Sequence, residues 1–399
     1  MVKENIAGII TETGGTTSHS AILARALEIP AVLSVEGVAS SLKNGDTVVV
    51  DGSEGAVIVN PDDNTVAEYS KKRDAFLAER KELENYRGRE TKSASGEVYE
   101  LFCNIGKPED AVKAVDADGE GVGLFRTEFL FMDRTSIPTE DEQFEAYKKA
   151  ALILKGKSLI IRTLDIGGDK DIPYLGLEKE ENPFMGFRAI RYCLKNRELF
   201  KSQIKAILRA SAFGDIKIMF PLITTMDELR DGKKLVAECK ADLRNMGINF
   251  NENIQVGVMV ETASAAVIAD MLAKEADFFS IGTNDLTGYT MACDRGNNDV
   301  SYLYSPLQPS VLRMIKRTIE CGVQNGISVG MCGEAAANKL MIPLLISFGL
   351  TEFSVSAPSV LNVRKIISTW TKEEADKVTA KVLEMSTQQE IVEYLKSVV

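Results

Sequence analysis

GVGLFRTE (residues 121–128) and SLIIRTLDIGG (residues 158–168) each begin with a short apolar run and end in charged or polar residues. A longer, more polar stretch of helix length separates them, so the pair has the form strand, helix, strand. Six further runs of the same kind lie beyond residue 91: VYELFCNIG, IKIMFPLI, IQVGVMVE, FFSIGTNDL, ISVGMCGE and TEFSVSA. Eight strands alternating with helices over roughly 300 residues predict an α/β fold, a (β/α)8 TIM barrel.

An open, doubly wound sheet is the competing architecture for this pattern. Such a sheet is expected to carry a glycine-rich dinucleotide turn after its first strand, and the sequence has none there. Helix starts between the runs support the alternation, because Thr139 with Glu142 and Thr225 with Glu228 fit capping boxes. The barrel is therefore the preferred prediction.

Two differently built segments precede the barrel, which we assign to residues 91–399. Residues 1–60 hold short apolar runs broken by glycine, with two strands predicted on either side of a turn at Asp51 and Gly52, and a short helix in SHSAILARALE. Residues 61–90 are dominated by charge and predict a solvated helix, which we expect to connect the two differently built parts. Thr65 and Glu68 fit a capping box that would begin this helix.

Composition limits the function classes. The 399 residues carry a formal net charge of -11, which argues against a nucleic-acid surface. The apolar runs are shorter than the roughly 20 residues of a spanning helix, and the first residues do not have the form of a signal peptide. Six cysteines without CxxC pairing fit reduced thiols. We expect a cytoplasmic protein that acts on neither a membrane nor a nucleic acid.

Barrel enzymes place their sites at the carboxyl ends of the strands, and the polar residues there suggest one chemistry. Three arginines end or follow runs, and guanidinium groups match the oxygens of a doubly anionic ligand: Arg126, Arg162 and Arg295. Glu261 and Asp285 end neighbouring runs and predict a Mg²⁺ site completed by substrate and water. Ion pairing across the barrel rim is the alternative for any one of them.

His19 is the single histidine of the chain. It begins a predicted helix directly after two glycines, where backbone N–H groups and the helix dipole favour an attached anion. Thr17 and Ser18 can hydrogen-bond the ring or that anion. Position and motif favour a nucleophile over a packed histidine.

Several motifs resemble one family. GGTTSHSAILARALEIPAV resembles the phosphohistidine motif of the enzymes that use phosphoenolpyruvate (PEP). The barrel motifs are similar to those of enzyme I of the bacterial sugar phosphotransferase system: GVGLFRTEFLFMDR, IIRTLDIGGDK, NPFMGFRAIR, SIGTNDLTGYTMACDRGN and MCGE. Pyruvate phosphate dikinases share the histidine motif, but the IGGDK segment favours enzyme I.

The resemblance implies a division of labour. His19 would accept the phosphoryl group of PEP, and Cys332 would protonate the enolate to give pyruvate. Mg²⁺ would be bound by Glu261 and Asp285, and PEP would be held by Arg126, Arg162, Asn284, Asp285 and Arg295. Arg188, within NPFMGFRAIR, is a weaker candidate for the pocket. The resemblance also implies a homodimer and a histidine phosphocarrier protein as partner, with residues 1–60 forming part of a swivelling phosphohistidine domain.

The chain also departs from the family pattern. The helical domain that docks the phosphocarrier and the first part of the phosphohistidine domain have no counterpart here. Gly288 stands where a glutamine is usual, and EAAAN replaces a more typical EMAGD after Cys332. Two other hypotheses therefore stay open. One is a PEP-binding, dimerising barrel without full phosphotransfer, and the other is a piece of a dikinase or PEP synthase, whose nucleotide-binding domain is not represented.

Overall fold

The structure, a computed structural model, describes residues 6–13, 24, 29–132, 134–167 and 172–399. The chain divides into two compact units, Met1–Asn85 and Tyr86–Val399.

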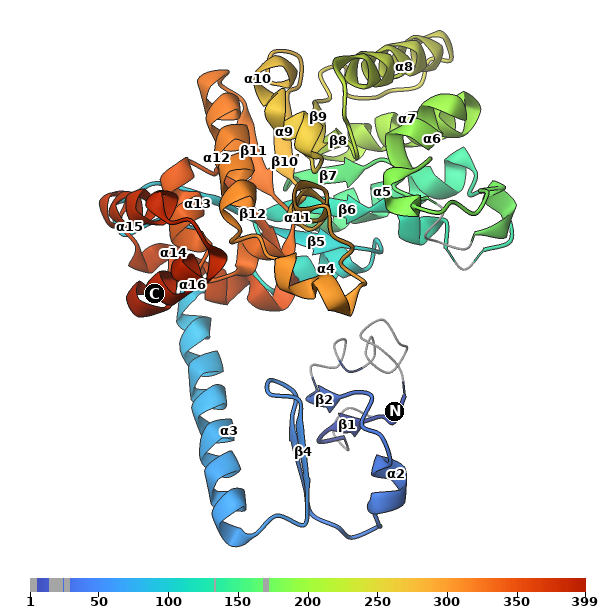
Figure 1. Cartoon of the computed structure of the whole chain (residues 1–399). Coiled ribbons are helices and arrows are strands. Elements are labelled where there is room, and N and C mark those ends of the chain that lie inside the picture. Colours follow the sequence, from blue (N-terminus) through green and yellow to red (C-terminus); the bar gives the residue numbers. More distant parts are fainter. Residues whose placement is uncertain (1–5, 14–23, 25–28, 133, 168–171) are drawn as a thin grey trace. The chain divides into compact units, whose positions relative to one another are not determined.

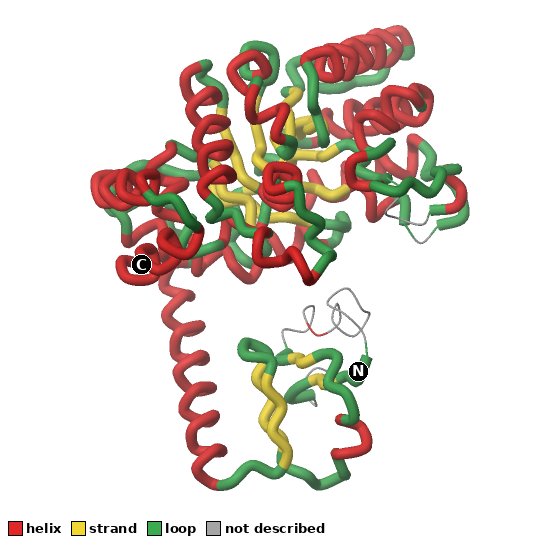
Figure 2. Tube along the Cα trace, viewed as in Figure 1, coloured by secondary structure: helices red, strands yellow, loops and turns green. Residues whose placement is uncertain are grey.

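The larger unit is a closed barrel of eight parallel strands, seen as yellow segments enclosed by helices in Figure 2. Neighbouring strands follow the order β10-β11-β12-β5-β6-β7-β8-β9. Their bounds are β5 Glu100–Ile105, β6 Gly121–Arg126, β7 Leu159–Arg162, β8 Ile216–Phe220, β9 Val256–Val260, β10 Phe278–Ile281, β11 Ser328–Met331 and β12 Glu352–Val355. The predicted (β/α)8 barrel is confirmed, and each predicted run contains one of these strands.

Helices surround this barrel in Figure 1. The α-helices are α4 Asp110–Asp116, α5 Glu140–Leu154, α6 Ala189–Lys195, α7 Arg197–Ala210, α8 Met226–Asn245, α9 Ala263–Val267, α10 Ala269–Leu272, α11 Thr283–Met291, α12 Pro309–Gln324, α13 Ile342–Phe348, α14 Val360–Thr369, α15 Lys372–Glu384 and α16 Gln388–Val398. Short 3-10 helices are η3 Thr127–Leu130, η4 Pro173–Leu175, η5 Pro183–Met185, η6 Ser211–Phe213, η7 Asn298–Leu303, η8 Glu334–Ala337 and η9 Ala357–Ser359. The capping boxes predicted at Thr139 and Thr225 open α5 and α8.

Alternate strand positions belong to two apolar clusters. Phe125, Ile161 and Val258 pack in the large cluster formed with the helices. The residues next to them along the strands make a second cluster, which fills the inside of the barrel: Leu124, Ile160, Met219, Met259, Phe278 and Cys332. Because both strand faces are covered, the strands are apolar almost throughout, as parallel strands usually are.

The smaller unit contains two strand pairs. Strand β1 (Ile9–Ile10) pairs in parallel with β2 (Ala31–Val32), and β3 (Val48–Asp51) pairs antiparallel with β4 (Ala56–Val59). The hairpin turns at the predicted position, because Asp51 Oδ1 accepts hydrogen bonds from the Ser53 and Glu54 amides. Helix α2 (Val38–Ser41) lies between β2 and β3 along the chain.

A 21-residue helix, α3 (Asp63–Leu83), ends this unit, followed by η2 (Glu84–Tyr86). The prediction that Thr65 and Glu68 begin the helix is wrong. Asp62 is the N-cap, and its carboxylate accepts a hydrogen bond from the Thr65 amide at 2.7 Å. An aspartate three residues upstream therefore takes the amide first. None of the α3 residues is buried.

Candidate active site at the carboxyl ends of the strands

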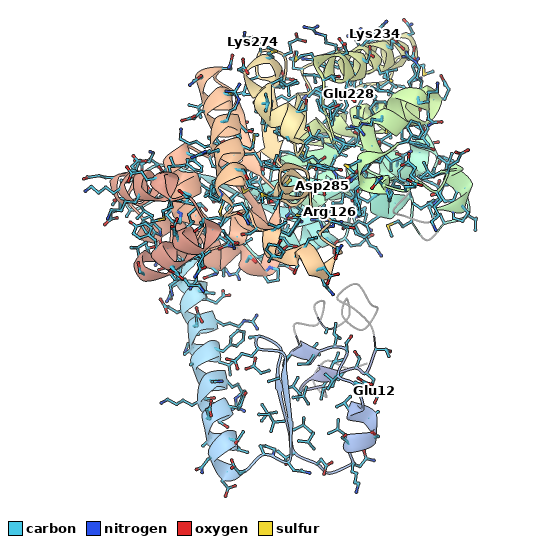
Figure 3. The ribbon with its side chains drawn as sticks, in the orientation of Figure 1. Glu12, Arg126, Glu228, Lys234, Lys274 and Asp285 are labelled. Carbon is cyan, nitrogen blue, oxygen red and sulfur yellow. The ribbon has the colours of Figure 1, made fainter. Side chains whose placement is uncertain are left out.

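The predicted site residues of the barrel lie at one end of it. Arg126 and Arg162 are the last residues of β6 and β7 and are register partners. Glu261 directly follows β9, and Cys332 directly follows β11. Asn284 and Asp285 occupy the first turn of α11, which begins two residues after β10. Figure 3 labels Arg126 and Asp285, which mark this end of the barrel.

Carboxylates and guanidinium groups alternate across this end of the barrel. Glu128 pairs with Arg162 at 2.6 Å, and Arg162 pairs with Asp165 at 2.8 Å. Asp165 also pairs with Arg188 at 2.7 Å, and Arg188 lies 3.2 Å from Asp285. Four of these side chains belong to residues that are at least nine-tenths buried: Glu128, Arg162, Asp165 and Arg188. Such pairs fix the guanidinium planes before any ligand arrives.

Arg188 joins Asp165 to Asp285 in this series of ion pairs, although the sequence ranked it as a weaker candidate. Its guanidinium also donates to the Tyr289 hydroxyl at 3.3 Å and lies 5.8 Å from the centre of the Phe184 ring. Asp165 and Glu128 end predicted runs but received no role from the sequence. The signal was present, since Glu128 lies two residues after Arg126 at the end of β6, and Asp165 lies three residues after Arg162 at the end of β7.

Two of the arginines keep unused donors. Among the residues that the structure describes, the Arg126 guanidinium has no hydrogen bond or ion pair, and it is only partly buried. Within the same part of the chain, the buried Nε of Arg162 has no hydrogen-bond partner. Buried donors are normally paired, so an unpaired one beside a free guanidinium suits an anionic ligand.

Arg295 lies at the exposed edge of the site, with half of its side chain accessible and 4.0 Å from Asp285. Its guanidinium lies 5.5 Å from the Phe184 ring centre, so Phe184 faces both Arg188 and Arg295. Asn284 is fixed through its backbone, because the Tyr304 hydroxyl donates to its carbonyl at 2.9 Å. These contacts bring all five predicted PEP-binding residues to the same end of the barrel.

The carboxylate of Glu261 is buried and is held in one orientation by a backbone hydrogen bond. It is 2% exposed, and one of its oxygens accepts a 2.7 Å hydrogen bond from the Leu222 amide. Leu222 has a φ of 55°, a left-handed backbone that is strained for leucine and aims its N–H at the carboxylate. A Cβ at Gly282 would lie 2.7 Å from the other oxygen, so glycine leaves room there.

Burial and the nearby Asp285 carboxylate raise the pKa of Glu261 well above its ordinary range. A divalent cation between the two carboxylates would remove this repulsion, so the donor set fits Mg²⁺. No group of three or more histidine, cysteine or acidic side chains suited to a metal occurs among the described residues. Glu261 and Asp285 alone would supply only part of a ligand set, which substrate oxygens and water would have to complete.

Cys332 lies at the same end of the barrel, and its side chain is buried. Burial raises the pKa of its thiol to about 11, and the Ser280 hydroxyl and the charges of Arg162 and Arg126 lower the pKa only part of the way. The thiol therefore keeps its proton at neutral pH. The adjoining Gly333 is packed so closely on Thr283 that a side chain would clash.

His19 lies outside the described residues, as do Thr17, Ser18 and most of the predicted helix that begins there. Residues 168–171, which contain the end of the IGGDK segment, lie outside them as well. No described helix is both long and apolar enough to span a membrane.

Known proteins match both units. Residues 80–371 match the family described as PEP-utilising enzyme, PEP-binding domain, and residues 1–55 match PEP-utilising enzyme, mobile domain. The chain is similar to the phosphoenolpyruvate-protein phosphotransferases of Staphylococcus carnosus (48% identity) and Bacillus subtilis (50% identity), each over 99% of this chain and 69% of the relative. The relative from Geobacillus stearothermophilus is 49% identical over 99% of this chain and 68% of its own length. The chain belongs to the PEP-utilising enzymes, as a phosphoenolpyruvate-protein phosphotransferase that transfers the phosphoryl group of PEP.

Proposed function

We propose that PEP binds at the carboxyl end of the barrel, with its phosphate and carboxylate held by Arg126, Arg162, Arg188 and Arg295. The alternating arrangement of arginines and carboxylates, with Arg126 and Arg162 Nε left unpaired among the described residues, is the observation that carries this proposal. Phosphoryl transfer depends mainly on positioning and charge neutralisation, and preformed guanidinium groups supply both.

The phosphoryl group passes to His19. An imidazole nitrogen attacks phosphorus, and the bond from phosphorus to the enol oxygen breaks, leaving an enolate. The Cys332 thiol gives its proton to the enolate carbon, which yields pyruvate, and the resulting thiolate regains a proton from solvent. A thiol with a raised pKa is protonated before the reaction and suits this step.

Glu261 and Asp285 would hold Mg²⁺, and the ion would neutralise charge on the phosphoryl and enolate oxygens when bound. The strained turn at Leu222 positions Glu261 for that task. Arg188 forms an ion pair with Asp285 and so orients that carboxylate.

Within the cell we place the enzyme in the cytoplasm, as a homodimer that passes its phosphoryl group to a histidine phosphocarrier protein. The charged helix α3 would connect the part that carries His19 to the barrel and act as a hinge. Crosslinking the two units together should then slow phosphorylation of His19, and an unchanged rate would refute the hinge.

A burst of pyruvate tests the proposal. PEP and Mg²⁺ are mixed with the chain in the absence of any acceptor, and pyruvate is counted with lactate dehydrogenase. Because His19 is filled once per chain, the expected burst is close to one pyruvate per chain, and His19→Ala should abolish it. PEP binding without a burst would instead support the alternative, a PEP-binding barrel without phosphotransfer. Release that depends on ATP would indicate a dikinase or PEP synthase.

A further inference from the structure

The amide side chain of Asn104 joins three strand ends on the side of the barrel that carries Cys332. Asn104 lies near the end of β5, which neighbours β12, and β12 neighbours β11. Its Nδ2 donates to the carbonyl oxygen of Cys332 at 3.0 Å and to that of Ser354 at 3.2 Å. One amide therefore links the backbone of β12 and the residue that follows β11 to β5.

The orientation of this amide is determined by its partners. Both carbonyl oxygens can only accept, so the end of the amide that faces them is the NH2 group. The opposite end, Oδ1, accepts a 2.7 Å hydrogen bond from the Ser354 hydroxyl. Ser354 is fully buried, and Asn104 is partly buried. All the polar atoms of this pair are consequently satisfied in one arrangement.

The pairing of β5 with β6 is irregular beside this side chain, and Gly123 is the extra residue, on β6. The register between β5 and β6 shifts by one residue between Cys103 and Asn104. Irregularities of this kind re-aim side chains and are common beside active sites. Gly123 on β6 leaves space for the Ser354 side chain, because a Cβ at this position would lie 2.5 Å from the Ser354 hydroxyl oxygen.

Cys332 is thereby held from two sides. Its amide donates to the Ile281 carbonyl at the end of β10, at 3.2 Å, while its carbonyl accepts from Asn104. Beyond it, Gly333 packs against Thr283 with no room for a side chain. Backbone displacement at this point would move the thiol relative to a bound substrate.

We infer that Asn104, oriented by Ser354, is a positioning residue that holds Cys332 where its thiol can protonate the enolate. The inference rests on the proposed role of Cys332 as proton donor and adds two residues that act through Cys332. A displacement of about 1 Å at a reacting group can cost on the order of 100-fold in rate. Loss of the amide is therefore expected to impair proton transfer more than PEP binding.

Two readouts on the full chain separate positioning from mere stability. The first is alkylation of the Cys332 thiol by iodoacetamide, followed by mass spectrometry of its peptide. The second is exchange of the methyl protons of pyruvate for deuterium in D2O with Mg²⁺ present, followed by NMR. In that exchange the thiolate removes a C3 proton from bound pyruvate, and a deuteron returns to the enolate carbon.

The variants are Asn104→Ala and Ser354→Ala, with Cys332→Ser as the reference for loss of the thiol. The matched control is Asn325→Ala, because Asn325 Nδ2 also donates to a cysteine carbonyl, that of Cys321 at 2.8 Å. This second bond lies at the end of α12, so its loss should change neither readout at Cys332.

Asn104→Ala is expected to increase alkylation of Cys332 about tenfold, because a strand end without its tie opens more often. Pyruvate exchange should fall by about 10- to 100-fold, while the affinity for PEP changes less than about threefold. Ser354→Ala should show the same changes, smaller in size. Parental alkylation and exchange in Asn104→Ala would overturn the inference, as would an equal loss of exchange and PEP affinity.

Failure of the proposed function would look different. If Cys332→Ser still exchanged pyruvate protons at the parental rate, Cys332 would not be the proton donor. Faster alkylation in Asn104→Ala would then show that the amide holds the strand end, but without the catalytic purpose inferred here. That combination would refute both the donor role and the positioning role that depends on it.

Discussion

Arg188 shows how a single residue can matter more than its motif suggests. It contacts Asp165 after β7, the Phe184 ring in η5, and Asp285 and Tyr289 in α11, so three segments of the barrel unit meet at its side chain. Removing one partner from a buried ion pair leaves an uncompensated charge, which usually costs several kcal/mol. At this site the same guanidinium is expected to face the substrate.

Arg188→Lys should keep the positive charge but lose the planar fork that reaches two carboxylates. We expect kcat/KM for pyruvate release to fall by about 10- to 100-fold, measured with the lactate dehydrogenase assay. Arg191→Lys is the control, since Arg191 lies one helical turn away and donates to the backbone of Met185 and Gly186. Equal activity of the two variants would argue against a role for Arg188 in the pocket.

Glu261 predicts the pH dependence of metal binding. Its pKa is raised by burial and by Asp285, to about 8, so the carboxyl is largely protonated at neutral pH without a metal. Mg²⁺ must displace that proton, so the affinity should rise with pH and level off above the pKa. We expect about a tenfold gain per pH unit below the pKa, measured by titration with Mg²⁺ or Mn²⁺. Glu261→Gln should bind weakly, with no such rise, and a rise that persists in this variant would contradict the assignment.

At the residue scale, topology explains why residues predicted for the site lie at one end of the barrel. Arg126 and Arg162 end strands, Glu261 and Cys332 directly follow strands, and parallel strands in a closed barrel must bring these ends together. Asn104 was not recognised, because its role depends on the carbonyls of two strands that are more than 200 positions away. Nothing local in VYELFCNIG indicates that contact.

At the scale of single elements, helix α6 begins with a strained backbone conformation. Ala189, the first residue of α6, has a φ of 51°, and so lies in the left-handed region that favours glycine. Its amide donates to the Ile166 carbonyl at 3.1 Å, which holds the turn after Arg188 in place. The left-handed backbone of Ala189 therefore adjoins the residue whose side chain pairs with Asp165, Arg188.

Ala189→Gly should therefore stabilise the barrel, by about 0.5–1 kcal/mol in the free energy of unfolding. Denaturation in urea measures the change. Ala150→Gly is the contrasting variant, because Ala150 is buried in the middle of α5, and glycine should destabilise it by about 1 kcal/mol or more. If Ala189→Gly lowered the free energy of unfolding as much as Ala150→Gly does, the backbone at Ala189 would not be strained.

The charged segment illustrates the limit of reading elements from sequence. Its helical character follows from composition, and α3 runs over Asp63–Leu83. The starting residue could not be assigned from the capping-box pattern, because two overlapping caps compete and Asp62 takes the amide of Thr65. Whether the boundaries 1–60, 61–90 and 91–399 separate working parts stays a prediction. The structure divides the chain between Asn85 and Tyr86.

At the scale of the whole molecule, the barrel interior contains a buried acidic residue that has no part in the proposed chemistry. Glu352 begins β12 and is 5% exposed, and its Oε1 has no hydrogen-bond partner among the described residues. Gly123 on β6 and Gly330 on the adjacent β11 leave space for its carboxyl, because a Cβ at either glycine would clash with it. Burial, then the charge of Glu100, raise its pKa to about 8, although Lys217 opposes the shift.

A raised pKa means that the folded chain binds this proton more tightly than the unfolded chain. Stability from this group is complete below the unfolded pKa and is lost as pH rises toward about 8. The free energy of unfolding of Glu352→Gln, relative to that of the parent, should therefore rise by roughly 2–4 kcal/mol between about pH 5 and about pH 9. Urea denaturation at each pH measures this difference. Glu384→Gln, on an exposed part of α15, should follow the parent. A Glu352→Gln chain with the parent's pH profile would contradict the buried, protonated carboxyl.

The central claim is that PEP bound at the barrel phosphorylates His19. It is tested most directly by incubating the chain with PEP labelled in its phosphate and with Mg²⁺, and then mapping acid-labile label to a peptide. Label is expected on the peptide that contains His19, and it should be absent in His19→Ala. It should be strongly reduced in Arg126→Gln, which removes a guanidinium proposed to hold PEP. Label that persists in His19→Ala, or no label although PEP binds, would contradict it.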